Sequence, residues 1–218
     1  EESYDEIHGE AEIDFNKRDE RITALRTDAL REVLERRGLP GIIELAERSN
    51  AAWQIGQLAA SALLSETLLI ELLRIAHGPI LEQEGEFFPR KHLIAGALGS
   101  LGNEKRETVL TGITNGLSDG SAVRLFLLGP FCRSTWKFVD ALDEGARGKY
   151  WNEVAPDWIK ESDDERNEAV NRLLDAQRPR AAFSCVRFHL RKLDTRLLSR
   201  LLSDMLKDGN DKPGHYQL

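Results

Sequence analysis

The residues of this chain that could carry out catalysis are few and scattered. Cys185 and His189 come closest to a catalytic pair, because four residues make about one helical turn and would bring the thiol to the imidazole. A nucleophilic thiol also needs donors that stabilise the oxyanion formed on the substrate, and no neighbouring motif supplies them. A free cysteine in a helical pattern is more often a core residue. The sequence therefore favours a structural Cys185.

The sequence offers only a weak candidate for a metal site. Asp5, His8 and Glu12 share one face if their segment is helical, and such a set could hold a metal ion. Acidic tails of this kind are more often solvated faces. The chain contains neither a His-Glu-x-x-His nor a Cys-x-x-Cys motif. We therefore expect neither a metal nor another cofactor.

A run of small residues suggests a phosphate-binding loop at first sight. Gly96, Gly99 and Gly102 recur at every third position. The run lacks the Gly-Lys-Ser/Thr ending of such a loop and follows no strand pattern. Ser100, within the run, lacks the flanking glycines of a nucleophile elbow. We interpret the glycines as a helix face that lets a second helix approach closely.

One segment, residues 178–200, points toward binding. It holds seven bases and a single acid. We predict a helix over residues 180–191, in which Arg180, Arg187 and Arg191 lie within about 60° of one another and form a stripe. The apolar residues of that helix fall on another face suited to the core; they are Phe183, Val186 and Leu190. The arginine stripe is the predicted binding site.

Two explanations of the arginine stripe stay open. The acidic region before it, residues 157–168, could pair with the arginines between neighbouring hairpins. Alternatively, the planar guanidinium groups could bind a peptide, a carboxylate or a phosphate backbone. Residues 1–20 hold nine acids and two bases, which equals the whole net charge of −7, so the body is neutral. A protein partner, or other domains of a parent chain, is therefore preferred, with nucleic acid at the stripe as the remaining alternative.

Apolar residues elsewhere recur with the helical period. Leu and Ala dominate the apolar set, and aromatic residues make up only 7% of the 218 residues. Gly38 should end the first helix, and Gly78-Pro79 should end one capped by Ser65. We divide the chain into an acidic segment, 1–18, that is partly disordered or a linker, a helical domain, 19–207, and a frayed tail, 208–218.

Recurring patterns indicate a repeat. Residues 65–73 and 194–202 both place a capping residue before Leu-Leu-x-x-Leu-Leu. Three helices begin with two small or hydroxyl residues followed by Trp53, Trp136 or Phe183, and we expect these aromatic side chains to be buried at equivalent places. Short connections make successive helices antiparallel. The predicted fold is all-α, with antiparallel hairpins stacked as an α-solenoid of the HEAT type.

The last 90 residues carry a family resemblance. The stretch from Tyr150-Trp151 through Arg-Pro-Arg-Ala-Ala-Phe, residues 178–183, to Leu202 resembles helical-repeat (HEAT/TPR-like) segments of large bacterial multidomain proteins, including STAND-type defence NTPases. The resemblance implies a sensor or scaffold array. No catalytic residue is carried over, because the NTPase and effector motifs of such proteins are absent here.

These patterns together predict a non-enzymatic scaffold or recognition segment that binds another macromolecule. The alternatives are an all-α enzyme with an unrecognised site and a structural spacer or dimerisation segment; the oligomeric state stays open. The chain starts with Glu, and Met205 is its one methionine, so we expect a piece of a larger protein. No apolar run approaches the ~20 residues of a membrane span. Two free thiols, Cys132 and Cys185, suit a cytoplasmic location.

Overall fold

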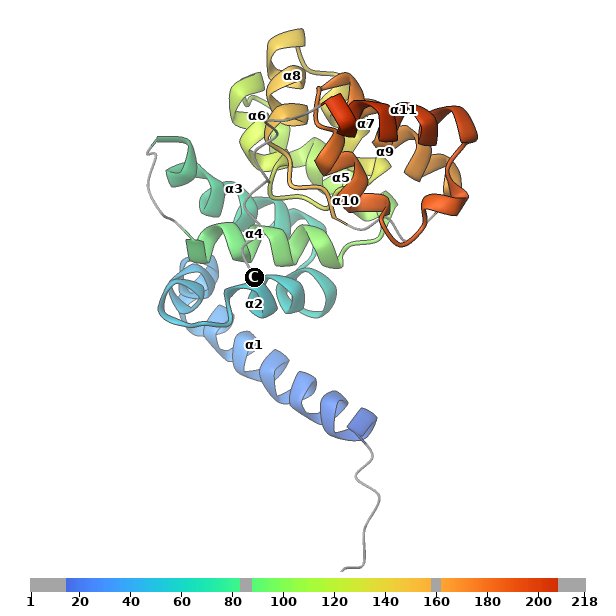
Figure 1. Ribbon diagram of the computed structural model, residues 1–218. Helices are drawn as coiled ribbons and strands as arrows, with labels where there is room; N and C mark the ends of the chain where they lie inside the picture. The colour runs from blue at the N-terminus through green and yellow to red at the C-terminus, as the bar shows by residue number, and fades with distance from the viewer. Residues whose placement is uncertain (1–14, 83–87, 158–161, 208–218) are drawn as a thin grey trace, which may run out of the picture.

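A computed structural model describes residues 15–82, 88–157 and 162–207 (Figure 1). Within these ranges all regular structure is helical and no strand occurs, which confirms the all-α prediction. The elements are α1 (Phe15–Arg48), α2 (Ala52–Leu58), a π-helix η2 (Ala59–Leu63), α3 (Glu66–Glu82), α4 (Phe88–Ser100), α5 (Asn103–Thr114), α6 (Asp119–Phe126), α7 (Arg133–Asp140), α8 (Glu144–Glu153), α9 (Asp163–Asp175), α10 (Pro179–Val186), a 3₁₀-helix η3 (Leu190–Lys192) and α11 (Thr195–Lys207).

Helix α1 consists of two segments joined at Gly38. This glycine has φ 64° and ψ −163°, which lies outside the helical region and favours a residue without a side chain. The expected helix stop is therefore found, although the first helix begins at Phe15 rather than at residue 19. The second segment is anchored by Ile42 and Ala46, both fully buried. The first segment extends away from the other helices (Figure 1).

Helices α2 and α4 cross at two glycines, one from each helix. A Cβ atom on Gly56 would lie 2.9 Å from the backbone nitrogen of Ala97 and closer still to the carbonyl oxygen of Leu93. A Cβ atom on Gly96 would likewise lie 2.8 Å from the carbonyl carbon of Trp53. The prediction of close helix approach is thus confirmed for Gly96. A Cβ atom on Gly99 or on Gly102 would meet no heavy atom within 4 Å, and Gly102 lies beyond the end of α4, so the prediction is wrong for these two glycines.

Helix α3 continues past the point where the sequence predicted its end. It runs through Gly78-Pro79 to Glu82. A proline in a helix leaves the carbonyl four residues earlier without its usual N–H donor, here the carbonyl of Ile75. The guanidinium of Arg90, on α4, donates to that oxygen over 3.5 Å. A donor distant in the sequence therefore replaces the missing hydrogen bond.

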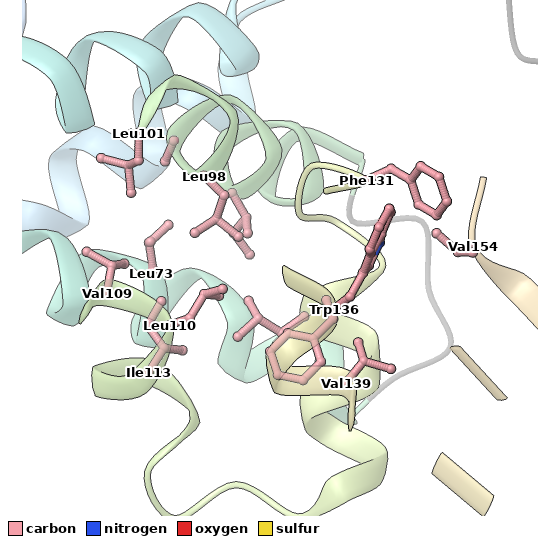
Figure 2. Packing of buried hydrophobic residues seen from close by; sticks show 14 of the residues in the cluster. Leu73, Leu98, Leu101, Val109, Leu110, Ile113, Phe131, Trp136, Val139 and Val154 are labelled. Carbon is pink, nitrogen blue, oxygen red and sulfur yellow. The ribbon is translucent and has the colours of Figure 1, made fainter. Parts of the chain in front are cut away.

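The apolar side chains form one continuous core that reaches from Leu30 to Leu201. Figure 2 shows part of it, with Trp136 beside Phe131 and Val139. The ring centroids of Trp136 and Phe131 are 4.9 Å apart. Trp136 is fully buried, as expected.

The expected equivalence of three aromatic anchors is wrong. Trp136 is buried, but the side chain of Trp53 is 45% exposed and that of Phe183 is half-buried. The backbone carbonyl group of Trp53 packs against Gly96 of α4, where the missing side chain leaves room for it. The indole of Trp53 therefore lies at the surface. Three matching sequence patterns therefore do not mark one structural position.

Contacts between helices follow a regular order. Helices two apart in sequence pack together along much of the chain: α2 on α4, α3 on α5, α5 on α7, α6 on α8, and α9 on α11. Successive helices also touch, including α3 with α4, α7 with α8, and α9 with α10. Helices three apart also touch, α1 with α4 and α3 with α6, so this spacing does not hold throughout the described residues.

A buried arginine joins the middle of the molecule. Arg106, on α5, is 6% exposed, and its Nε donates to the carbonyl of Leu98 over 3.0 Å. Its Nη1 donates to the hydroxyl of Ser134 on α7 over 2.8 Å and to the sulfur of Cys132 over 3.4 Å. These bonds fasten the end of α4 and the start of α7 to α5. We assign Arg106 and Cys132 a structural role.

Candidate functional site

The structure separates the three arginines predicted to form a stripe. The single helix expected over residues 180–191 is wrong, because α10 ends at Val186 and a turn leads into η3. Arg180 lies in the first turn of α10, Arg187 caps its carboxyl end, and Arg191 belongs to η3. All three are exposed, and the guanidinium of Arg187 lies 4.7 Å from the ring centre of Phe188. They remain predicted binding residues without a common helix face.

Other bases of the 178–200 segment have structural partners. The guanidinium of Arg178 donates to the carbonyls of Trp151 and Val154 at 2.9 and 2.7 Å, and so caps the end of α8. Arg200 pairs with Asp175 at 2.7 Å. Two of the acids proposed as partners of the stripe have ion-pair partners outside it: Asp163 pairs with Arg166, and Glu168 pairs with Arg133 and Arg172. These ion pairs lie within α9, between α7 and α9, and between α9 and α11.

Cys185 and His189, the thiol and imidazole considered as a catalytic pair, do not lie on one helix. Cys185 is buried within α10, whereas His189 follows the end of that helix. Burial raises the pKa of the Cys185 thiol to about 12, so it is protonated at neutral pH. Asp5, His8 and Glu12 lie outside the described residues. The described residues contain no cluster of His, Cys, Asp and Glu side chains that could hold a metal ion.

The structure brings a different set of polar residues together, in a groove between α8 and α9 that we call the α8/α9 groove. Its volume is about 610 Å³. The lining residues come from the end of α7, from α8, and from the end of α9; they are Asp140, Glu144, Arg147, Gly148, Trp151, Asn152, Arg172, Asp175, Ala176 and Gln177. Helix α8 has ten residues and is about 15 Å long. The groove can thus hold four or five residues of an extended chain.

Arg172 is a fixed element of the α8/α9 groove. Its Nη1 and Nη2 atoms donate to the two carboxylate oxygens of Asp140 at 2.5 and 2.8 Å, and Nη2 also donates to Glu168 at 2.6 Å. The guanidinium also lies 5.3 Å from the ring centre of Trp151 and 5.8 Å from that of Trp136. Partial burial lowers the pKa of Arg172, but hydrogen bonds and charge from Asp140 and Glu168 outweigh this and raise it. Arg172 therefore provides a rigid, charged wall.

Three polar side chains on α8 are available to a ligand. Glu144, Arg147 and Asn152 all line the α8/α9 groove. Within the part of the chain that the structure describes, none of the three side chains forms a hydrogen bond or an ion pair. The carboxylate of Glu144 accepts hydrogen bonds, the guanidinium of Arg147 donates them, and the carboxamide of Asn152 does both. The groove can therefore recognise groups with mixed hydrogen-bonding character.

Gln177 contributes a fourth polar side chain, from an unusual backbone position. It has φ 58°, the one positive φ among the described non-glycine residues. The backbone nitrogens of Gln177 and Arg178 donate to the carbonyls of Leu174 and Leu173, at 3.0 and 2.9 Å. This pattern is a Schellman motif, whose left-handed position usually belongs to glycine. Gln177 is not among the site residues predicted from the sequence, although a non-glycine residue stands there between the end of a helix pattern and Arg178-Pro179.

A second cavity, of about 300 Å³, lies between α3 and the turn that joins α5 to α6. We call it the His77 cavity. Its lining residues are Arg74, His77, Gly78, Ile113, Asn115, Gly116 and Leu117. His77 is 1% exposed, and its Nε2 atom has no hydrogen-bond partner. Burial, followed by the positive charge of Arg124, lowers the pKa of His77 to about 4. The imidazole is therefore neutral at pH 7.

The lowered pKa of His77 predicts acid destabilisation. Between pH 6.5 and about 4 the unfolded chain binds a proton at this residue and the folded chain does not, so stability falls as the pH falls through this window. The loss reaches about 3 kcal/mol, at roughly 1.36 kcal/mol per pH unit. The measurement is urea unfolding at several pH values, compared with His77→Leu, which should lack this part of the pH dependence. Parallel curves for the two proteins would contradict the assignment.

Comparison of the chain with protein-family models, with curated proteins and with solved structures finds no match. Among the described residues, no helix is both long enough and apolar enough to cross a membrane.

Proposed function

We propose that this chain is a non-enzymatic recognition module, an α-solenoid-like array that binds an extended segment of a partner protein in the α8/α9 groove. As predicted from the sequence, the module would act within a larger cytoplasmic protein. The partner segment is either a separate protein or another part of the parent chain. The arginines at positions 180, 187 and 191 remain candidates for additional contacts with an acidic portion of that partner.

The order of helix contacts supports the array. In stacked hairpins each helix packs on the next helix and on the one after it, because equivalent helices of adjacent hairpins form a layer. The contacts of α2 with α4, α3 with α5, and α6 with α8 have this spacing. Such arrays present long surface grooves rather than deep pockets, and grooves of that kind suit extended chains.

The chemistry of the α8/α9 groove favours a peptide over other ligands. A peptide backbone carries donors and acceptors in alternation, and the carboxamide of Asn152 offers both. The carboxamide of Gln177 offers its oxygen and its second N–H, because its Nε2 atom also donates to the carbonyl of Leu174 over 3.4 Å. Arg147 and Glu144 can select side chains of either charge. Arg172 is already bound to two carboxylates, which makes the groove a poor site for a phosphate backbone.

The observation that carries the proposal is the backbone of Gln177. Holding a side-chain-bearing residue in the left-handed region costs about 1 kcal/mol relative to glycine. In return the residue adds a carboxamide to the wall of the groove. A position that lowers stability while placing a polar group in a groove is typical of a binding site.

Substituting Gln177→Gly should therefore stabilise the protein and weaken binding. We expect the free energy of unfolding to rise by about 1 kcal/mol, because the left-handed strain is removed. Peptides selected from a phage-displayed random dodecapeptide library should bind the variant roughly three- to tenfold more weakly. A decrease of this size corresponds to the loss of about one hydrogen bond. The measurements are denaturant unfolding and fluorescence polarisation with the selected peptides.

The control is Gln54→Ala, which removes an exposed glutamine of α2 far along the chain from the groove. It should leave peptide affinity unchanged, whereas Asn152→Ala should weaken it as Gln177→Gly does. Selection that yields no peptide sensitive to Asn152 or Gln177 would reject the groove as a recognition site. Light scattering that gives twice the 24.6 kDa mass of the chain would favour the dimerisation alternative.

A further inference from the structure

A further groove lies between α9 and the start of α11, and we call it the α9/α11 groove. Its volume is about 300 Å³, and its lining residues are Asn167, Asn171, Asp194, Arg196, Leu197 and Arg200. None of them lines the α8/α9 groove. Leu197 is 6% exposed and adds an apolar contact to an otherwise polar lining. A space at this lower end of small-molecule sites suits one flat heterocyclic ring.

Two asparagines give the groove donors and acceptors. Asn167 and Asn171 are one turn apart on α9, so their side chains lie on the same face. The Oδ1 atom of Asn167 accepts from the backbone nitrogen of Asp194 over 3.2 Å, which orients the carboxamide and leaves its NH₂ group as a donor. The side chain of Asn171 forms no hydrogen bond within the described residues. The two carboxamides can therefore bind the mixed donor and acceptor edge of a nucleobase.

Two arginines at one end of the groove are available to an anion. Arg196 lines the groove, and Arg191, in η3, precedes Asp194 by three residues, so the Cα atoms of Arg191 and Asp194 are at most about 11 Å apart. Neither guanidinium forms an ion pair with a carboxylate of the described ranges. Lys192 is not counted with them, because its charge interacts with that of Asp163.

The carboxylates near the groove have partners of their own. Asp194 is the one acid among the described residues of the lining, and its Oδ1 atom accepts from the backbone nitrogens of Arg196 and Leu197 at 2.8 and 3.4 Å. Asp175 and Asp204 both pair with Arg200. The arginine end of the groove is thus open to a phosphate group.

We propose that the α9/α11 groove binds single-stranded nucleic acid, with one base in the groove and the adjoining phosphates on Arg191 and Arg196. The base packs on Leu197 and forms hydrogen bonds with the two asparagines. A single strand exposes the base edges that a duplex covers, so only a single strand can enter in this way. Guanidinium groups bind phosphate oxygens through paired hydrogen bonds. This binding does not depend on the peptide binding proposed for the α8/α9 groove.

The test is fluorescence polarisation of the full chain with labelled twelve-nucleotide probes: oligouridylate, oligoadenylate, oligodeoxyadenylate and a DNA duplex. In about 50 mM NaCl we expect the single strands to bind and the duplex to bind at least tenfold more weakly. With two phosphate contacts, the logarithm of the affinity should fall against the logarithm of the salt concentration with a slope of about −1.4. Equal affinity for RNA and DNA, or a preference for RNA, supports the proposal, and a preference shows that the 2′-hydroxyl is also bound.

Variants separate the phosphate contacts from the base contact. Arg191→Gln and Arg196→Gln should each weaken binding about fivefold and make the salt slope about 0.7 less steep. Asn171→Ala should weaken binding about three- to tenfold without changing the slope, because it removes a neutral hydrogen bond. All three side chains are exposed, so urea unfolding should match that of the parent. The control is Arg36→Gln, an exposed arginine of α1, which lies away from α11 (Figure 1); it should change neither affinity nor slope.

Three results would overturn the proposal. The first is no saturable polarisation change with any single strand, and the second is equal affinity for the duplex. The third is equal affinity for a labelled twelve-residue oligoglutamate, which would assign the arginines to an acidic protein segment instead.

Discussion

Gly56→Ala and Gly96→Ala should each lower the free energy of unfolding by about 3 kcal/mol or more. Each added methyl group would overlap the backbone of the facing helix, and backbone atoms cannot rotate away as a flexible side chain can. Helices α2 and α4 would have to separate, which also loosens the core around Leu93 and Ala97. Denaturant unfolding of the single variants measures the effect.

A matched control lies in the same helix. Gly99 is exposed in α4, and a Cβ atom there would have no neighbour within 4 Å. Gly99→Ala should therefore raise stability by about 0.5–1 kcal/mol, the ordinary helix preference for alanine. The double variant Gly56→Ala/Gly96→Ala should lose less free energy of unfolding than the two single variants added together. One displacement of α2 from α4 relieves both overlaps. Similar small effects at all three glycines would show that the close crossing is wrong.

Trp136→Ala should be comparably severe, with a loss of about 3–5 kcal/mol in the free energy of unfolding. Trp136 is fully buried among Phe131, Trp151 and Val139, so its removal leaves a large cavity at the centre of the core. Its indole nitrogen is buried without a hydrogen-bond partner. Trp136→Phe should accordingly cost much less than Trp136→Ala, since the ring is kept and the unpaired N–H is lost.

The comparison variant is Trp53→Ala. Trp53 is 45% exposed, so its truncation should cost under about 1 kcal/mol. Thermal or urea unfolding of the two alanine variants gives the contrast directly. Equal losses at positions 53 and 136 would restore the equivalence of the two positions that the sequence pattern suggested.

Local signals predicted many helix boundaries correctly, because they act over three or four residues. Ser65 caps α3 by accepting from the backbone of Leu68 over 3.4 Å, and Gly38 divides α1. The helix boundaries that were predicted wrongly depend on contacts with residues far away in the sequence. Arg90 allows α3 to pass Pro79, and the chain must reverse between α10 and α11, which pack on each other, so no helix spans residues 180–191.

The two candidate sites could not be found from the sequence for a related reason. The α8/α9 groove combines residues from three helices, and nothing in the spacing of Asn152 and Arg172 shows that they meet. His77 is a single histidine in an apolar pattern, which is usually a core residue with a satisfied ring. Its missing partner becomes visible only when the turn through Asn115 is placed beside α3.

The projecting first segment of α1 has a thermodynamic consequence. Between Lys17 and Arg37 only Thr27 and Leu30 are buried, so few tertiary contacts stabilise this helical segment. Its ion pairs, such as Arg31 with Asp28 and Arg36 with Glu32, connect neighbours on the same helix. Most of the stability of a helix in a protein comes from tertiary packing of its apolar face, and this segment has little of it. The start of α1 is therefore a separate unit that can melt while the rest of the protein stays folded, and a partner that ordered it would supply the missing cooperativity.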